Sequence, residues 1–193
     1  DDSKCIRCGK CVHSCPFGAI GYKSSIVNVI KAIKSGKKVY AMLAPATEGQ
    51  FGVDITMESW KKAMKEVGFT DFIEVGLGGD LTAKYEAEEW VEAYKDGRKK
   101  VTSCCPGFVN LVRKHYPELS DMISTTVSPM CAVSRLVKAK EPDAVTVFIG
   151  PCLAKKSEIA DQRIEGNADY ALTYSEIRAI MRAKGVALEP ADN

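Results

Sequence analysis

The sequence lacks the features that mark membrane, exported and nucleic-acid-binding proteins. Its 193 residues carry a net charge of only +2, which predicts no binding to nucleic acid or to an anionic membrane. The longest strongly apolar run, Val39 to Ala46, is far too short to span a bilayer. No basic start followed by a hydrophobic stretch is visible, so no signal peptide is apparent and we expect a cytoplasmic protein. Histidine is scarce as well, and His13 and His115 belong to no motif.

Cysteine, in contrast, is plentiful. Eight cysteines without an export signal predict reduced thiols that bind metal, with a disulfide framework as the weaker alternative. The apolar fraction of 46% and the charged fraction of 27% are those of an ordinary globular protein. The length suits one α/β domain with a small appendage.

Strand and helix patterns alternate after a cysteine-dense start. Strands are predicted at residues 39–43, 72–75, 99–102, 144–149 and 171–173, and helices at 26–34, 56–67, 80 or 82 to 94, 107–115, 129–140 and 175–184. This order predicts an α/β fold with a mainly parallel sheet flanked by helices. The run Gly76 to Gly79 lacks the third glycine of a dinucleotide-binding loop, so we interpret it as a turn.

The first cysteines follow the spacing C-x2-C-x2-C-x3-C-P, in Cys5, Cys8, Cys11 and Cys15. This is the spacing of bacterial ferredoxins that bind [4Fe–4S] clusters, and the fourth cysteine normally reaches a different cluster. A zinc site is the alternative. Only four residues precede Cys5, too few to supply the missing ligands, so we expect that the chain is cut at its start. Alternatively, the run stays without metal or uses all four thiols in one strained cluster. We take residues 1–24 as a partial ferredoxin-like segment and 25–193 as a second, partial domain.

Three further cysteines lie near the predicted junctions between strands and helices. Cys104 and Cys105 are adjacent, and successive side chains of an extended segment leave opposite faces, so the two thiols are expected to do different jobs. Cys152 occupies an equivalent junction later in the chain. The carboxyl ends of strands are where α/β proteins keep their sites, and these thiols therefore predict half of a metal site.

Two segments resemble signatures of the iron-only, or [FeFe], hydrogenases. Residues 102–108, Thr-Ser-Cys-Cys-Pro-Gly-Phe, look like the first signature of that family, and residues 150–158, Gly-Pro-Cys-Leu-Ala-Lys-Lys-Ser-Glu, resemble its second, M-P-C-x-x-K-x-x-E. Both follow a ferredoxin-like run, which precedes the catalytic domain in many members. The resemblance thus covers nearly the whole chain.

The resemblance implies a role for each candidate residue. Cys105 and Cys152 would bind a cubane [4Fe–4S] cluster linked to a two-iron centre, Cys104 would relay protons to that centre, and Lys155 would place its ammonium against a cyanide ligand. Residues that would line the pocket are Ser128, Pro129, Met130, Ala44 and Pro45. Residues that match the proton path and the end of the second signature are Glu86, Glu89, Ser124 and Glu158.

Each of these residues also has a simpler interpretation. Glu86 and Glu89 belong to an acidic helix run, which is usually a solvated face. Ser124 is a cap if no site exists, and Lys155 is a surface lysine, as we expect Lys156 to be. Cys131 matches no ligand, and a buried apolar thiol is predicted.

Departures from the family pattern limit the prediction. Gly150 replaces the methionine that usually precedes Pro-Cys, and Phe108 stands where tryptophan is common. A third signature with two more cysteines should follow Cys152, and no cysteine follows it here. We therefore expect part of a longer protein whose remainder completes the active centre.

The resemblance implies reversible formation of hydrogen, 2H⁺ + 2e⁻ ⇌ H₂, with [4Fe–4S] clusters as electron relays and ferredoxin or a similar carrier as the partner. Two alternatives remain open. One is a non-catalytic relative that transfers electrons or senses hydrogen, which Gly150 favours. The other is an iron–sulfur assembly factor of the related eukaryotic type.

Overall fold

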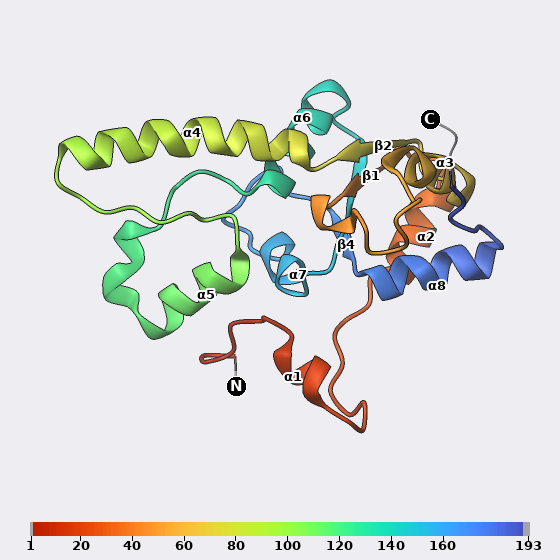
Figure 1. The fold of residues 1–193 in the computed structure, drawn as a ribbon, viewed down its shortest axis with the longest axis horizontal. Helices are drawn as coiled ribbons and strands as arrows, with labels where there is room; N and C mark the ends of the chain where they lie inside the picture. The colour runs from red at the N-terminus through yellow and green to blue at the C-terminus, as the bar shows by residue number, and fades with distance from the viewer. Residues whose placement is uncertain (1, 191–193) are drawn as a thin grey trace.

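The core of the fold is a four-stranded parallel sheet. The structure is a computed structural model that describes residues 2–190 (Figure 1). The strands are β1 (Val39–Leu43), β2 (Asp71–Glu74), β3 (Val145–Ile149) and β4 (Tyr170–Leu172), in the spatial order β2-β1-β3-β4. The α/β class with a parallel sheet is thereby confirmed. The order reverses between β1 and β3, so a crevice is expected outside the carboxyl ends of these two strands.

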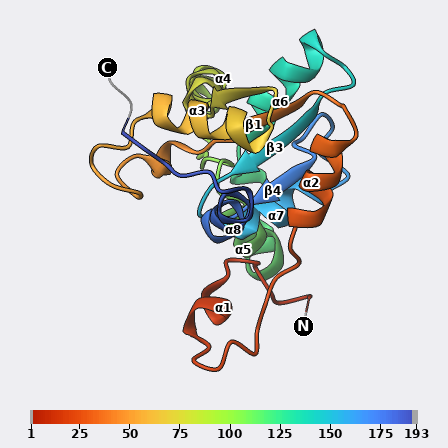
Figure 2. The same cartoon turned by 90° about the vertical axis from the view of Figure 1, so that its right-hand side faces the viewer.

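Helices cover both faces of the sheet (Figure 2). On one face lie α2 (Ile26–Lys34), α3 (Met57–Val67) and α8 (Tyr174–Lys184), and on the other lie α4 (Gly76–Lys95) and α6 (Pro129–Lys140). Alternation along β1 and β3 produces two cores, because successive side chains leave opposite faces. Leu43 and Ile149 pack against the first group of helices, whereas Met42 and Phe148 pack against α6.

The other elements lie at the edges of this layered core. They are α1 (Lys10–Ser14), η1 (Pro45–Thr47), α5 (Pro106–His115), η2 (Pro117–Met122) and α7 (Ala154–Ile159). Figure 1 shows α4 extending well beyond the sheet, with α5 and η2 beneath its far half and the N-terminal segment below α5 and α7. Within residues 2–190, no helix has the length and apolar character needed to cross a membrane.

Local signals explain where several helices begin and end. Thr56 caps α3 and forms a capping box with Ser59, and Gly68 ends the helix with a φ of 107°. Thr173 forms a second capping box with Glu176 at the start of α8. These positions agree with the predicted bounds because each signal acts within a single turn.

The prediction of a turn at residues 76–79 is wrong. These residues form the first turn of α4, which begins at Gly76 rather than at residue 80 or 82. The reason lies in packing: Gly78 is buried against α6, where a Cβ atom would lie 2.8 Å from Cγ2 of Val133 and closer still to the carbonyl oxygen of Pro129. The glycine allows α4 and α6 to approach closely.

The predicted strand at residues 99–102 is also wrong. This segment makes one isolated parallel bridge, between Val101 and Ile123, and does not join the sheet. Its backbone pairs with a neighbouring loop, since Val101 N donates to Met122 O and Ser124 N donates to Val101 O, both at 2.8 Å. The adjacent cysteines therefore follow a loop, and only the helix side of the predicted junction is correct.

Candidate functional site

The predicted site begins at the carboxyl ends of β1 and β3, on either side of the reversal in strand order. Ala44 and Pro45 follow β1, and Gly150 to Cys152 follow β3. Backbone bonds hold the two loops in place: Ala44 N donates to Ile149 O at the end of β3 at 2.9 Å, and Gly150 N donates to Leu172 O in β4 at 3.1 Å. Gly150 is close-packed, because a Cβ atom there would lie 2.7 Å from Cζ of Phe148 and 2.9 Å from Cβ of Ala44.

The cysteine pair reaches the same region through α5. Cys105 is the N-cap of this helix, and Pro106 occupies its first turn, which suits a residue without an N–H. Both thiols of the pair are free and exposed. Gly107 is buried where α5 meets α7, and a Cβ atom on it would lie 3.8 Å from Cβ of Ala154. The cysteine pair and the Cys152 loop therefore begin two helices that pack against each other.

A buried ion pair lies beside these loops. Lys155 and Glu158 have side chains only 11% and 7% exposed, and their Nζ and Oε2 atoms are 2.7 Å apart. Lys155 also donates to the carbonyl oxygen of Cys104 at 3.2 Å, and the hydroxyl of Ser128 donates to Glu158 in a short hydrogen bond. Lys155 is thus no surface lysine, and it connects the two signatures directly.

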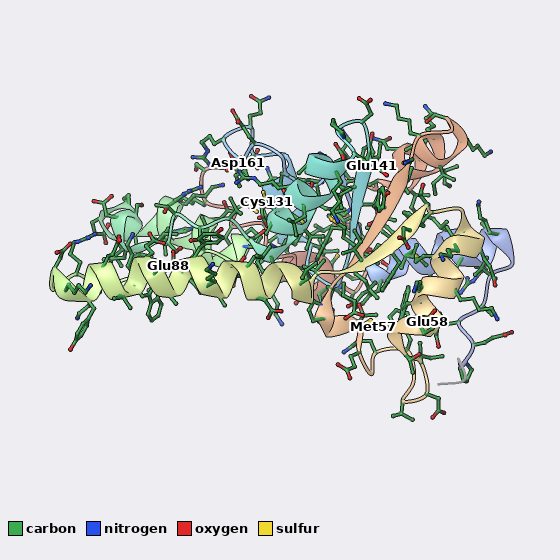
Figure 3. All side chains as sticks on the ribbon, turned by 90° about the horizontal axis from the view of Figure 1, so that it is seen from above. Met57, Glu58, Glu88, Cys131, Glu141 and Asp161 are labelled. Carbon is green, nitrogen blue, oxygen red and sulfur yellow. The ribbon has the colours of Figure 1, made fainter. Side chains whose placement is uncertain are left out.

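The start of α6 supplies the remaining pocket residues. Ser128 caps the helix by accepting a hydrogen bond from Cys131 N at 3.4 Å, and Pro129 and Met130 form its first turn. Met130 is fully buried, whereas Pro45 is exposed. Cys131 is buried as predicted (Figure 3). Burial raises the pKa of its thiol, so it stays neutral.

Glu86 on α4 faces the cysteine pair rather than solvent. Its carboxylate accepts hydrogen bonds from Thr102 Oγ1 at 2.9 and 3.0 Å and from Ser103 N at 3.2 Å. Thr102 Oγ1 also accepts a bond from Cys104 N at 3.4 Å. Glu86 is thus linked to Cys104 through one intervening hydroxyl. Glu88, between the two predicted acids, is exposed on α4 (Figure 3).

Glu89 forms a second cluster one turn farther along α4. Ser124 Oγ donates to it at 2.6 Å, and the ammonium of Lys100 lies 2.9 Å away. Burial raises the pKa of Glu89, but hydrogen bonds from Ser124, Lys100 and Thr125 N outweigh it and lower the pKa to about 2. Ser124 also accepts from Thr126 N at 3.1 Å, so it is a loop cap and a partner of Glu89 at once. The two clusters adjoin, because Ser103 Oγ donates a short hydrogen bond to the carbonyl oxygen of Thr126, the residue whose N–H donates to Ser124.

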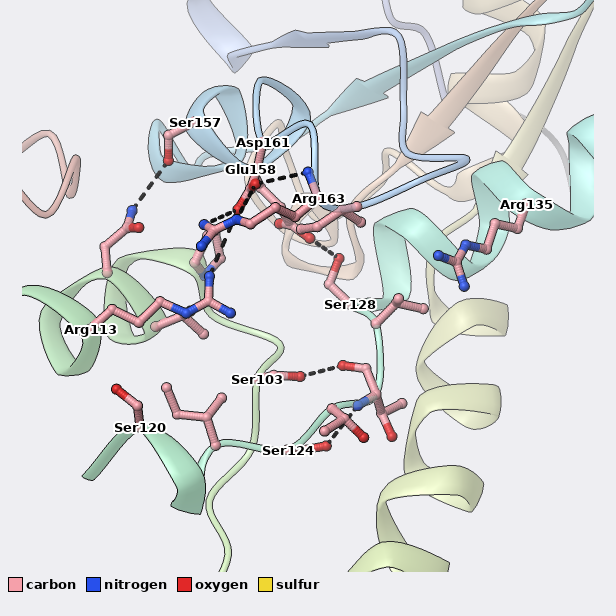
Figure 4. Close-up of a pocket in the computed structure, with 18 residues that line it drawn as sticks. Ser103, Arg113, Ser120, Ser124, Ser128, Arg135, Ser157, Glu158, Asp161 and Arg163 are labelled. Atoms are coloured by element: carbon pink, nitrogen blue, oxygen red, sulfur yellow. Dashed lines mark hydrogen bonds and ion pairs between the residues drawn. The ribbon is translucent and has the colours of Figure 1, made fainter. Parts of the chain in front are cut away.

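A cavity of about 530 Å³ opens beside these groups (Figure 4). Ser103, Ser124, Ser128 and Glu158 line it, together with three arginines, Arg113, Arg135 and Arg163. Figure 4 shows Arg113 and Arg163 reaching toward Asp161. The hydrogen bond from Arg163 holds the pKa of Asp161 below its usual value, so these two arginines face a carboxylate that already neutralises them in part.

The N-terminal cysteine segment lies next to the loop that carries Cys152. Cys8 and Cys152 line a common cavity of about 690 Å³, and a Cβ atom on Gly9 would lie 2.5 Å from Cδ1 of Leu153. Cys5, Cys8 and Cys11 are exposed. Backbone N–H groups of Ala19 and Phe17 lower the pKa of the Cys15 thiol, which favours the thiolate needed for metal binding.

The far end of α5 holds this N-terminal segment in place. Asn110 Nδ2 donates to Ile6 O at 3.2 Å, and Lys114 Nζ donates to Cys5 O at 2.8 Å. His115 Nε2 lies 2.9 Å from Lys4 O, which accepts only, so the ring nitrogen donates. No sequence motif indicates these contacts, because each joins residues more than a hundred positions apart.

The donors in both regions fit iron–sulfur ligation in chemistry, though not as complete ligand sets. Reduced thiols are the ligands of [4Fe–4S] clusters, and all eight cysteines are free. In the described part of the chain, however, no three Cys, His, Asp or Glu side chains converge closely enough to share a metal ion. Cys105 and Cys152 supply two thiols beside a buried cation, which is the donor chemistry of part of a cluster site.

Taken together, the parallel sheet, the paired thiols and the ferredoxin-like run define a class of iron–sulfur protein. Residues 37–193 match the family described as iron only hydrogenase large subunit, C-terminal domain, and residues 1–21 match the 4Fe-4S binding domain. The chain therefore belongs to the iron-only hydrogenase large-subunit family. Its fold and its N-terminal iron–sulfur segment agree with the predicted resemblance.

Relatives fall into two groups. The periplasmic [Fe] hydrogenase large subunit of Nitratidesulfovibrio vulgaris is 32% identical over 96% of this chain and 58% of its own length. The NADP-reducing hydrogenase subunit HndD of Solidesulfovibrio fructosivorans is 28% identical, over 96% and 36%. The cytosolic Fe-S cluster assembly factor NAR1 of Candida dubliniensis is 24% identical, over 93% and 35%. The chain thus spans between about a third and three-fifths of the length of these relatives.

Proposed function

We propose that this chain is part of an iron-only hydrogenase that catalyses 2H⁺ + 2e⁻ ⇌ H₂. The observation that supports this most is the buried Lys155–Glu158 pair beside the cysteines. Burying two charges costs desolvation that their attraction barely repays, so such a pair is a poor device for stabilising a fold. A fixed cation at this place instead suits a negatively charged ligand bound between the two signatures.

The proposal gives each residue a task. Cys105 and Cys152 hold a cubane cluster, and Cys5, Cys8, Cys11 and Cys15 serve an N-terminal [4Fe–4S] cluster. When bound, the cubane and its linked di-iron centre supply the redox chemistry.

Cys104 carries protons between solvent and the bound centre. Thr102 connects the backbone of this cysteine to Glu86, whose carboxylate is a proton acceptor within reach of that hydroxyl. Ser124 and Glu89 form the outer part of the path. Ser103 joins the two parts of the path by donating to the carbonyl oxygen of Thr126, and a water molecule would carry the proton between Glu86 and Glu89.

The pocket around the bound centre is dry and rigid. Ala44 is buried at the end of β1, and Ser128 and Met130 are buried at the start of α6. Glu158 holds Lys155 in place through their ion pair. Pro45 and Pro129 shape the loops that carry these groups. Exclusion of water strengthens the attraction of the ammonium for an anionic ligand.

The remaining parts of the proposal concern the setting. A ferredoxin or similar carrier delivers electrons to the N-terminal cluster, the protein works in the cytoplasm, and the rest of the longer protein completes the ligand set.

The test uses the full-length protein, matured with its di-iron centre. Cys104→Ala should abolish hydrogen evolution from a reduced low-potential dye, whereas Cys131→Ala, at a buried thiol outside the site, should retain it. Infrared spectra of both variants would show whether the di-iron centre is loaded. Turnover in a loaded Cys104→Ala variant would contradict the proposal, as would no turnover in a loaded wild-type protein.

An iron–sulfur assembly role is the second candidate, because relatives with that name match most of the chain. This role has no use for a proton path. Cluster transfer to an acceptor protein that survives in Cys104→Ala, with no hydrogen evolution by the wild type, would favour it.

A further inference from the structure

Lys100 is a largely buried cation that belongs to neither signature. Its side chain is 10% exposed, and its ammonium lies 2.9 Å from Glu89 Oε1. The same nitrogen is 3.4 Å from the carbonyl oxygens of Asp121 and Ile123. The next residue, Val101, is held by its bridge to Ile123, so main-chain pairing as well as side-chain contacts directs Lys100 at Glu89.

Glu89 is surrounded by donors. Besides Lys100, it accepts from Ser124 Oγ at 2.6 Å, from Thr125 N at 3.1 and 3.2 Å and from Thr125 Oγ1 at 3.3 Å. Each of these bonds favours the carboxylate over the protonated acid. Among the described residues, Lys100 is the one cation that forms an ion pair with Glu89, and Glu86, one turn earlier, is directed at Thr102 and Ser103.

The ionised carboxylate determines how Ser124 is arranged. Because an anion offers only acceptors, the serine must donate its hydroxyl proton to Glu89. The lone pairs of Ser124 Oγ then face the other way, where they accept from Thr126 N. A protonated Glu89 could donate instead, and the hydroxyl would lose this fixed direction.

We propose that Lys100 is a positioning residue of the proton path: its ammonium keeps Glu89 ionised and so fixes the direction in which the hydroxyl of Ser124 donates. The inference rests on the proposed function because the path is meaningful only if it leads to Cys104. The local part, control of Glu89 by Lys100, is measurable without turnover.

The first experiment measures the ionisation of Glu89 in the purified chain. Carbon-13 NMR of side-chain-labelled glutamate, assigned by loss of a signal in Glu89→Gln, gives its titration midpoint. Lys100→Met should raise this midpoint by about one to three pH units, a ten- to thousandfold change in acid dissociation constant. Lys100→Arg should keep it near the wild-type value, since the cation remains. An unchanged midpoint in Lys100→Met would overturn the proposal.

A matched control comes from Lys138, which likewise pairs with a carboxylate and a carbonyl group, those of Asp169 and Asn167. Lys138→Met removes an equivalent ion pair elsewhere and should leave the Glu89 midpoint unchanged. If Lys100→Met does not fold by circular dichroism, Lys100→Gln replaces it, with the same expected and contradicting results. A midpoint that moves equally in Lys138→Met would show a general loss of structure and overturn the specific role.

The second experiment follows hydrogen evolution against pH in the matured full-length protein. Lys100→Met should displace the pH profile, and Lys100→Arg should restore it. A folded Lys100→Met variant with the wild-type profile would overturn the role in the path. A loaded wild-type protein without turnover would instead refute the proposed hydrogenase function, while the NMR titration would still decide whether Lys100 controls Glu89.

Discussion

Gly78→Ala tests the contact that places α4 over the site. A Cβ atom at this position would lie 2.8 Å from Cγ2 of Val133 and closer still to the carbonyl oxygen of Pro129. Carbon atoms in contact ordinarily lie about 3.5–4.0 Å apart, so α4 and α6 must separate by several tenths of an ångström or more. Such overpacking costs about 1–3 kcal/mol, and the backbone oxygen cannot rotate away as a side chain would.

Gly79 provides the matched control because it lies in the same turn of α4, and a Cβ atom on it would have no neighbouring atom within 4 Å. Both substitutions replace a helical glycine by alanine, which by itself favours the helix by roughly 0.5–1 kcal/mol. The difference between the two variants therefore isolates the clash. For a chain of this size, about 1–3 kcal/mol lowers the melting temperature by roughly 2–12 °C.

Urea unfolding followed by circular dichroism measures this difference. Gly79→Ala should equal or slightly exceed the wild type in free energy of unfolding, and Gly78→Ala should fall below both. Equal stabilities of the two alanine variants would refute the close packing of α4 on α6. That result would instead support the interpretation of residues 76–79 as a turn.

Two further predictions concern other contacts. Glu176→Gln should lower the free energy of unfolding by about 1.5–3 kcal/mol at neutral pH, because it removes the carboxylate that binds Lys156. Burial raises the pKa of Glu176, but the bonds from Lys156 and from backbone N–H groups outweigh burial and lower the pKa below its ordinary value of 4.5. The stability difference between wild type and Glu176→Gln, measured by urea titration, should therefore be complete above about pH 5 and shrink as the pH falls through the lowered pKa. A stability difference that stays constant down to about pH 2 would contradict this. Gly150→Ala should lower the free energy of unfolding by about 1–3 kcal/mol, because the new Cβ atom would clash with the ring of Phe148. Adding Phe148→Leu to this variant should recover part of the loss. Purely additive effects of the two substitutions in a thermal melt would show that the Phe148 ring does not cause the clash.

Much of the fold was predictable because its signals are local. The bounds of β1 were predicted correctly from one buried run, and those of α3 from Thr56 and Gly68, which act within a turn. The segment 99–102 has strand-like residues too, but a strand needs a partner, and Val101 finds one only in a loop. Pairing over long distances is a property of the whole fold, which a local pattern does not contain.

In the site, too, some features could be predicted from local sequence and others depend on the whole fold. The resemblance to the second signature indicated Lys155, and the structure shows it buried. Lys156, expected at the surface, is only 14% exposed and binds Glu176 and Ala171 O. Lys100 was missed altogether, because nothing in its neighbourhood distinguishes it from Lys99. The roles of the cysteines remain predictions, since their chemistry depends on bound groups rather than on the fold alone.

Helix α5 has a consequence for the two sets of cysteines. It begins directly after Cys105, and its last turn holds the backbone at Cys5. Ten residues at about 1.5 Å each make a rigid helix of roughly 15 Å, so its length fixes the distance between the two thiol regions. Inserting or deleting one residue would change that spacing by about 1.5 Å and turn one end by about 100° relative to the other. The separation of two redox sites would thus be set by the length of a single helix.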